Sequence, residues 1–156
     1  MNVGKYALHE HPVWRDRSNY IVQAPLNIED DLETELEFEQ LWTRQIDDSH
    51  FELCCIPFFL YDVALGDVLE VSEEGVVRRV KSTSGRYVFR VWLGDDGYPR
   101  SKVEADLISL GSLTEWASND LLAVDARNLS HAQEVADYLQ MQANSGRLEF
   151  ETGKQT

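Results

Sequence analysis

Two adjacent cysteines, Cys54 and Cys55, are the residues of this chain best suited to covalent chemistry. A thiolate is a strong nucleophile when a histidine lies near enough to take its proton. His50 precedes Cys54 by four residues, and on one extended strand this spacing separates the two side chains by about 13 Å. A catalytic pair would have to recruit one of the other three histidines, and no sequence feature indicates that. We therefore predict no catalytic residue.

Two of those histidines flank Glu10, and His9 and His11 would lie on the same side of an extended segment. A metal site needs further ligands at suitable spacing, and the sequence offers none near this pair. We expect the segment to be a solvated terminal arm. Ser84-Gly85-Arg86 is too short to count as a phosphate-binding loop. The sequence predicts no metal, no cofactor and no enzymatic activity.

Acidic residues are concentrated in one early stretch of this 156-residue chain. The formal net charge is −14, and residues 29–52 hold ten acidic residues against one basic residue, Arg44, which gives that stretch −9. Such a charge repels nucleic acids and anionic membranes, so we expect neither as a partner. It fits a protein partner with a basic surface.

Glutamates alternate with apolar residues before position 40, and the apolar parity continues to Trp42 and Ile46. Period-two alternation indicates a strand, here over residues 35–46, with one buried and one acidic face. Asp47-Asp48-Ser49 is typical of a turn, and we expect a return strand at 50–56. The alternative is that the charges only keep the protein soluble and protect an edge strand. The predicted partner-binding surface consists of Glu33, Glu35, Glu37, Glu39, Asp47 and Asp48.

An aromatic segment follows Pro57. Phe58, Phe59 and Tyr61 could line a pocket for a ligand that carries a ring. The alternative, which we favour, is a crossover that plugs the open end of a β-sheet, because large aromatic side chains in small domains mostly belong to the core. Asp67 most simply serves the turn in which it follows a glycine.

Residues 75–94 contain no acidic residue. Together with neighbouring aromatic residues, their cations could present a sheet face to single-stranded RNA. No RNA-binding motif accompanies them, and the aromatic residues Tyr87 and Phe89 alternate with the arginines rather than sharing their face. We favour pairing of the cations with the acidic strand. The basic residues are Arg78, Arg79, Lys81, Arg86 and Arg90.

The order of expected elements predicts an α+β fold. Short strands at 68–71, 76–81 and 86–93 follow the first hairpin and indicate a small barrel or strongly twisted sheet. The period then becomes helical, with capping boxes at Ser101 with Glu104 and at Ser130 with Gln133. With 86–93 as the first strand, the order is β-α-β-β-α-β, the ferredoxin-like arrangement. We expect an N-terminal arm or extra edge strand at 1–31, a β unit at 32–85 and a ferredoxin-like half at 86–156, packed as one body.

Four short motifs are Leu41-Trp42, Ile56-Pro57-Phe58-Phe59, Leu65-Gly66-Asp67-Val68 and Ser84-Gly85-Arg86. In these motifs, residues 41–93 resemble a bacterial family known only as a domain of unknown function, numbered 4265. The resemblance continues through Leu121–Asp125 and the last expected helix. The resemblance implies a bacterial source and agrees with the expected fold. The family has no established activity from which a function could be inferred.

We expect a cytoplasmic protein, because the start of the chain lacks an apolar signal core and two neighbouring cysteines are typical of reduced thiols. Charge, size and the lack of a catalytic set lead to our hypothesis of a non-enzymatic binding protein. We expect an immunity protein that covers the basic active site of a cognate toxin, an analogy of size, charge and setting. The alternatives are a small-molecule-sensing regulatory module with a cleft between the two halves, and an enzyme that uses Cys54 or Cys55.

Overall fold

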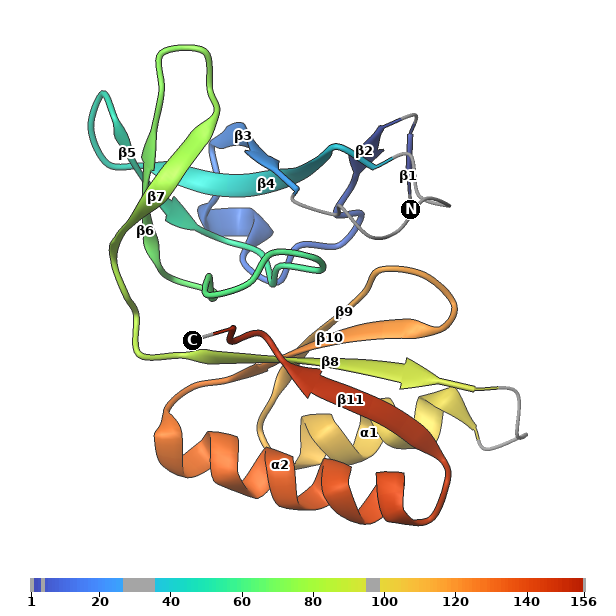
Figure 1. Ribbon diagram of the computed structural model, residues 1–156. Helices are drawn as coiled ribbons and strands as arrows, with labels where there is room; N and C mark the ends of the chain where they lie inside the picture. Colours follow the sequence, from blue (N-terminus) through green and yellow to red (C-terminus); the bar gives the residue numbers. More distant parts are fainter. Residues whose placement is uncertain (1, 4, 27–35, 95–98, 156) are drawn as a thin grey trace.

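The computed structural model describes residues 2–3, 5–26, 36–94 and 99–155. Two β-sheets lie one above the other, and helices cover the lower sheet on the side away from the upper one (Figure 1). The protein is therefore of the α+β class, as the sequence predicts. Within the described ranges, none of the helices has the length and apolar character needed to cross a membrane.

The upper sheet curls back on itself. Strands β4 to β7 pair in sequence as antiparallel neighbours, and β3 pairs with β4. The backbone N–H of Gln23 in β3 donates to the carbonyl of Gly75, just before β7 (2.8 Å), so the two edges meet. In the described residues this sheet contains β1 (Asn2–Val3), β2 (Tyr6–Ala7), β3 (Tyr20–Pro25), β4 (Phe38–Gln45), β5 (His50–Leu53), β6 (Val68–Val71) and β7 (Val77–Ser82).

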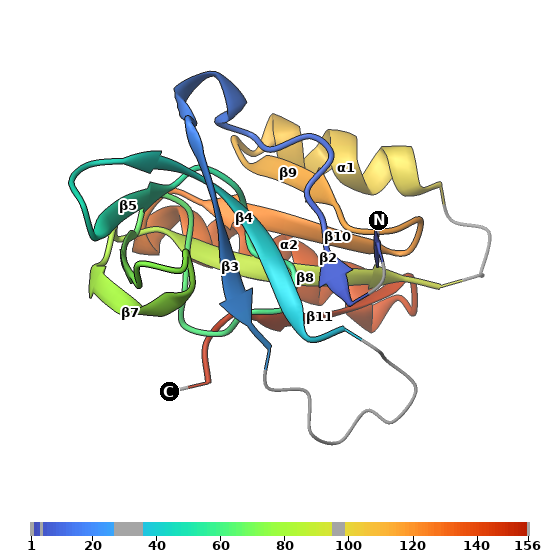
Figure 2. The same cartoon turned by 90° about the horizontal axis from the view of Figure 1, so that it is seen from above.

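The segment expected to be an N-terminal arm contributes the strands β1, β2 and β3 to this sheet. β3 pairs with β4 along its whole length, and its alternating residues Val22 and Ala24 are buried in the core of the sheet. β2 pairs in parallel with the start of β4. The short 3-10 helix η1 (Arg15–Arg17) precedes β3, and Figure 2 shows β3 running from η1 across β4. The arm is therefore a structural element of the β unit.

The face of β4 that points into the core is the opposite of the one predicted, because its odd-numbered residues from 39 to 43 are buried. Its buried side chains are Glu39, Leu41 and Thr43, whereas Phe38 and Trp42 are only partly buried. A shift of one residue exchanges the two faces of a strand, so the expected outward position of Glu39 is wrong. The physical reason is a set of hydrogen-bond donors that meets the Glu39 carboxylate inside the protein.

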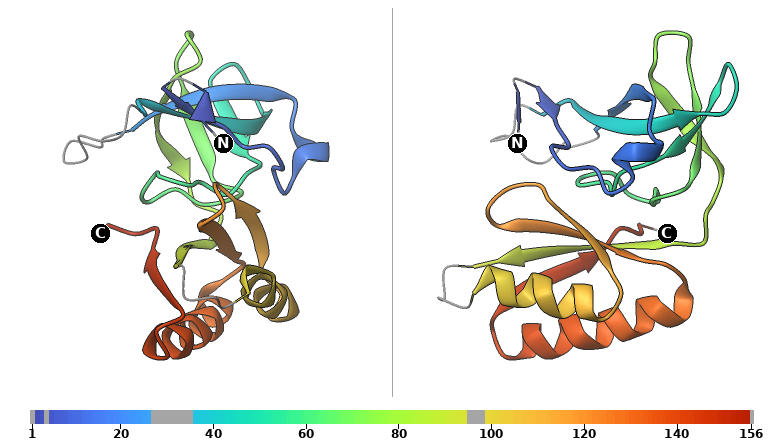
Figure 3. Two further views of the ribbon diagram at one scale, coloured as in Figure 1. Left: turned by 90° about the vertical axis from the view of Figure 1, so that its right-hand side faces the viewer. Right: turned by 180° about the vertical axis from the view of Figure 1, so that it is seen from behind.

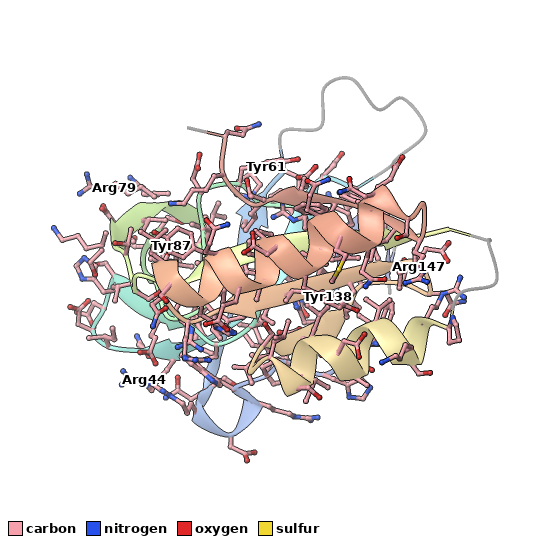
Figure 4. The ribbon with its side chains drawn as sticks, turned by 90° about the horizontal axis from the view of Figure 1, so that it is seen from below. Arg44, Tyr61, Arg79, Tyr87, Tyr138 and Arg147 are labelled. Atoms are coloured by element: carbon pink, nitrogen blue, oxygen red, sulfur yellow. The ribbon has the colours of Figure 1, made fainter. Side chains whose placement is uncertain are left out.

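The lower sheet has the strand order β11-β8-β10-β9, and all neighbouring strands are antiparallel. Its strands are β8 (Tyr87–Leu93), β9 (Leu113–Trp116), β10 (Leu121–Ala126) and β11 (Leu148–Thr152). Helix α1 (Arg100–Ser109) connects β8 to β9, and α2 (Leu129–Asn144) connects β10 to β11. The hydroxyl of Tyr138 in α2 donates to the carboxylate of Asp106 in α1 (2.7 Å), and Figure 4 shows Tyr138 between the two helices.

Both predicted capping boxes are wrong. Ser101 lies inside α1, and Glu104 accepts a hydrogen bond from the indole N–H of Trp116 in β9 (3.0 Å). The N-cap of α2 is Asn128, whose side chain accepts from the backbone N–H of His131 (2.8 Å). Asparagine and serine cap helices about equally well, so the local sequence did not discriminate between Asn128 and Ser130 as the start of α2.

The two sheets share a core. One hydrophobic cluster joins the lower sheet to the helices, a second fills the curled upper sheet, and a third lies between the sheets. The third contains Ile56 and Phe58 from the upper half and Val88 and Ala123 from the lower sheet. β10 is buried along its whole length, and the halves form one body (Figure 3).

Candidate functional site

The acidic residues predicted to bind a partner do not share one face. Glu33 and Glu35 lie outside the described residues. Glu37 is exposed at one end of β4, and the acids of the β4–β5 turn are exposed beyond the other end. Glu39, which lies between them, is wholly buried. The described side chains on the outer side of β4 therefore form no continuous acidic surface.

A different acidic surface forms at one end of the upper sheet, where two turns lie side by side. The β4–β5 and β6–β7 turns each carry two exposed acids. The backbone N–H of Val71 donates to the carbonyl of Ser49 (2.8 Å) and holds the turns together, and Figure 1 shows both loops at the same end. An isoleucine at the first turn is 47% exposed. We define the acidic end as Ile46, Asp47, Asp48, Glu73 and Glu74.

The first turn of the acidic end has a fixed shape. The Asp47 carboxylate accepts from the backbone N–H groups of Ser49 (3.0 Å) and His50 (2.9 Å), and the His50 ring lies 2.9 Å from it. These bonds, led by that of Ser49, lower the pKa of Asp47. Asp47 therefore presents a negative charge in a defined position at neutral pH.

The aromatic segment is divided between core and surface. The Phe58 ring is buried and stacks on the ring of His9, with 3.9 Å between centroids. Phe59 is half-buried and meets Phe58 edge-on at 6.4 Å. Tyr61 is 38% exposed, and its ring lies against the guanidinium of Arg90 (4.7 Å). Phe58 thus belongs to the core between the sheets.

Three of the basic residues, Arg79, Arg86 and Arg90, pair with carboxylates outside β4. Arg79 in β7 pairs with Glu70 in β6, and Figure 4 shows Arg79 projecting from the molecule. The guanidinium of Arg86 makes two hydrogen bonds to the buried carboxylate of Asp125 in β10 (3.0 and 2.8 Å). Arg90 is 2% exposed. The expected pairing with the acidic strand is therefore wrong for these residues.

His9 is buried between the two sheets, and its prediction as part of a solvated arm is wrong. Its ring nitrogens bind carboxylates from different halves: Nε2 lies 2.7 Å from Glu39 Oε2 in β4, and Nδ1 lies 2.7 Å from Glu115 Oε1 in β9. All three side chains are at most 2% exposed. We refer to His9, Glu39 and Glu115 as the buried triad.

The same two carboxylates hold a segment that lacks regular secondary structure. Glu39 accepts from the backbone N–H groups of Phe58 (2.7 Å) and Phe59 (2.9 Å), and Glu115 accepts from that of Ile56 (2.6 Å). These amides are buried and have no neighbouring strand to bond, and an unpaired buried amide is costly. The glutamates therefore take the place of a strand beneath the Ile56–Phe59 motif.

The geometry of the triad requires two protons between its three groups. Two lone pairs cannot face each other at 2.7 Å, so each nitrogen–oxygen contact needs a hydrogen. Burial alone would lower the pKa of His9, but interactions with Cys55, Glu115 and Glu39 outweigh burial and raise it well above its ordinary value. Burial raises the pKa of the Cys55 thiol, which keeps its proton at neutral pH. The charge that holds the imidazolium is therefore that of the two carboxylates.

The structure places His9 beside Cys55, so a histidine does lie near one of the two cysteines, although no sequence feature indicated this. Both ring nitrogens of His9 are occupied by carboxylates, so the ring cannot take the proton of the thiol. Burial raises the pKa of Cys54 to about 11 and that of Cys55 as well. In this conformation the buried triad keeps both ring protons of His9, and His9 does not activate the Cys55 thiol as a nucleophile. Across the described ranges, no group of three or more His, Cys, Asp or Glu side chains is arranged to hold a metal ion.

A further buried carboxylate, Asp67, joins two of the sequence motifs. It accepts from the backbone N–H groups of Ala64 (2.9 Å) and Ser84 (2.8 Å), and the Ser84 hydroxyl donates to the carbonyl of Leu65 (2.7 Å). Gly66 has φ +83°, and a Cβ at this position would lie only 3.1 Å from the Cβ of Ser84. Asp67 thus serves its own turn, as predicted, and also anchors the loop that enters β8.

A small cavity of about 110 Å³ lies beside Asp67 at the junction of the two halves. Residues 62–64, Asp67 and Thr83 line it from the upper half, and residues 85–88 and 153–154 line it from the lower half. Its charged lining includes Arg86 and Lys154, and burial raises the pKa of Asp67. Most ligand pockets measure roughly 300–1,000 Å³, so this cavity fits only a few non-hydrogen atoms.

The sequence reasoning missed the buried triad because its members lie 30 and 106 residues from His9. One signal was present: Glu39 shares its parity with Leu41 and Thr43, and His9 shares its parity with Ala7. A polar residue in phase with small or apolar ones on a strand is a candidate for a buried, paired position.

Comparisons with known proteins show the fold and the family. The crystal structure of a hypothetical protein from Neisseria gonorrhoeae is similar with a TM-score of 0.71 at 16% sequence identity, over 86% of this chain and 93% of that one. At this identity the similarity concerns the fold alone. No curated protein matches the chain. Residues 39–150, which include Glu39 and Glu115 but not His9, match a family described as a domain of unknown function. This chain therefore belongs to that family, DUF4265.

Proposed function

We propose that this chain is a non-enzymatic binding protein that contacts a basic surface of a partner protein through its acidic end. The observation that carries the proposal is the pair of turns held side by side, with four exposed acids and the exposed Ile46. Carboxylates held in place lose less conformational entropy on binding. Exposed charges of one sign also accelerate association with a partner of the opposite sign.

For the partner we propose a bacterial toxin whose active site is basic, which makes this chain an immunity protein. Enzymes that act on nucleic acids or nucleotides carry basic clefts, and two adjacent acidic turns can enter such a cleft. A cytoplasmic setting suits this role, and the two buried, unpaired cysteines are typical of a reducing compartment.

The test is complex formation with the toxin encoded beside this gene, measured by gel filtration and surface plasmon resonance. Charge reversal at Asp48, Glu73 and Glu74 together is expected to lower affinity at least tenfold, mainly through slower association at low salt. Asp47 is left unchanged because it holds the turn. Glu134→Lys, an exposed change on α2, is the matched control and is expected to have no effect. Absence of a complex, or a complex insensitive to the triple reversal, would refute the proposal.

The cavity at the junction favours a second candidate, a small-molecule-sensing regulatory module. Both halves line the cavity, so a ligand there would change how they pack. Its volume restricts the ligand to one of a few non-hydrogen atoms, such as a short carboxylic acid. Thermal-shift screening of such compounds is expected to give a concentration-dependent rise in melting temperature that Lys154→Ala reduces. No shift with any compound would exclude this function.

For the fold of residues 86–156 we propose the ferredoxin-like classification. The strand order β11-β8-β10-β9, the antiparallel pairing and the two crossover helices support it. An experimental structure with a different strand order would refute this classification.

A further inference from the structure

Residues 5–14, which we call the strap, run across both halves of the molecule, and Figure 2 shows this segment passing from β2 to η1 beside β9. At its start, the carbonyl of Lys5 accepts from the backbone N–H of Glu37 (2.8 Å). At its end, the backbone N–H of Trp14 donates to the carbonyl of Cys54 (3.0 Å) and that of Val13 donates to Glu115 (3.3 Å). The strap is therefore attached to the upper sheet at both ends and to the lower sheet near its end.

His9 lies in the middle of the strap and supplies its buried polar contacts. The next polar residues, Glu10 and His11, are exposed. The groups that face the His9 ring are Glu39 from β4, Glu115 from β9, and Cys55 with the Phe58 ring from the segment beneath. The two carboxylates that bind His9 also bind the amides of residues 56–59, so the strap and that segment depend on the same charges.

We propose that the protonated imidazole of His9 locks the strap across the two sheets, and that loss of this proton releases the strap together with residues 56–59. With the proton present, one positive and two negative charges share the buried site. Without it, two carboxylates remain in a closed space with a single imidazole N–H between them. A buried charge that has lost its partner strongly destabilises the surrounding structure.

The direction of the pH dependence follows from the raised pKa of His9 in the folded chain. The stabilisation by the triad is complete below the ordinary histidine pKa of about 6.5 and is lost as pH rises through the folded-state pKa. The strap is therefore released at alkaline pH. Release would also uncover Cys55, which lies against the His9 ring in the closed state.

The test begins with NMR of the ¹⁵N-labelled histidine rings, with His11 as an internal control. Both ring nitrogens of His9 are expected to stay protonated at pH values above the ordinary histidine pKa of about 6.5. Amide hydrogen exchange then follows residues 5–14 and 56–59 against α2 as the reference. As His9 loses its proton, exchange in both segments is expected to rise at least tenfold relative to α2, and Cys55 to become open to alkylation. His11→Gln is expected to leave this profile unchanged.

Three results would overturn the proposal. One is a neutral His9 ring at pH 7. Another is deprotonation of His9 with no change in the relative exchange of residues 56–59. The third is global unfolding, with α2 losing its protection together with the strap, before His9 titrates. These measurements use the native chain, so they do not require that a variant at His9 folds.

Discussion

Replacement of Glu39 by alanine tests the inverted parity of β4 and the buried triad together. The carboxylate accepts three hydrogen bonds, from the His9 ring and from the backbone N–H groups of Phe58 and Phe59. Alanine removes the acceptor and leaves all three donors buried, with a charged imidazole among them.

The expected loss is large because the group is fully enclosed. Breaking a buried charged pair by removing one partner costs about 3–5 kcal/mol, so we expect the free energy of unfolding to fall by about 4 kcal/mol at pH 7. For a chain of this length, that loss lowers the melting temperature by roughly 8–16 °C. Glu39→Gln keeps the volume and one acceptor oxygen but not the charge, and we expect about half the effect.

Glu37→Gln is the matched control, two residues earlier and just before the same strand. Glu37 is exposed and pairs with Lys5 at 3.4 Å, both side chains being at least half exposed, so we expect a change below about 0.5 kcal/mol. Urea denaturation followed by tryptophan fluorescence measures all three variants. Equal, small effects at positions 37 and 39 would refute the buried position of Glu39 and restore the outward acidic face.

Three further predictions concern other parts of the structure. Cys54 and Cys55 are expected to resist iodoacetamide at pH 7.5 and to react in urea, because a pKa of about 11 leaves roughly one Cys54 thiol in a few thousand ionised. Rapid labelling of the folded protein, measured by mass spectrometry, would contradict their burial. Gly66→Ala is expected to destabilise more than Gly75→Ala in urea melts, because both glycines have positive φ but only at Gly66 would a Cβ meet neighbouring atoms, 3.1 Å from Ser84; equal losses would contradict the close packing. Arg86→Met is expected to lower the free energy of unfolding by about 3 kcal/mol at pH 7 and by less at pH 5, because burial raises the pKa of Asp125 and its protonation removes the unpaired charge. A loss of stability that does not depend on pH would show that Asp125 is not the group involved.

Local patterns were sufficient to place most elements. Alternation and turn residues predict strands close to β5, β6, β7 and β8, and helical periodicity predicts α1 and α2. These signals are local because side chains two apart on a strand, or three to four apart on a helix, share a face whatever the remainder of the chain does. The exact start of α2 was not predictable, since Asn128 and Ser130 both offered a cap.

The face of β4 was not determined by its own pattern. Leu41 and Trp42 are adjacent apolar residues of opposite parity, so either face could be the buried one. The choice depends on what a glutamate meets inside the protein. A carboxylate is buried only when donors compensate for its lost water, and those of Glu39 come from His9 and from residues 58–59.

Local sequence patterns are sufficient to predict the α+β class, the positions of the main strands and helices, and the turn at Asp47-Asp48-Ser49. Long-range contacts in the folded chain place the β4–β5 and β6–β7 turns together and let His9 join β4 to β9. Both depend on contacts between residues far apart in the chain, where burial removes water and makes each hydrogen bond and charge count for more than any local preference.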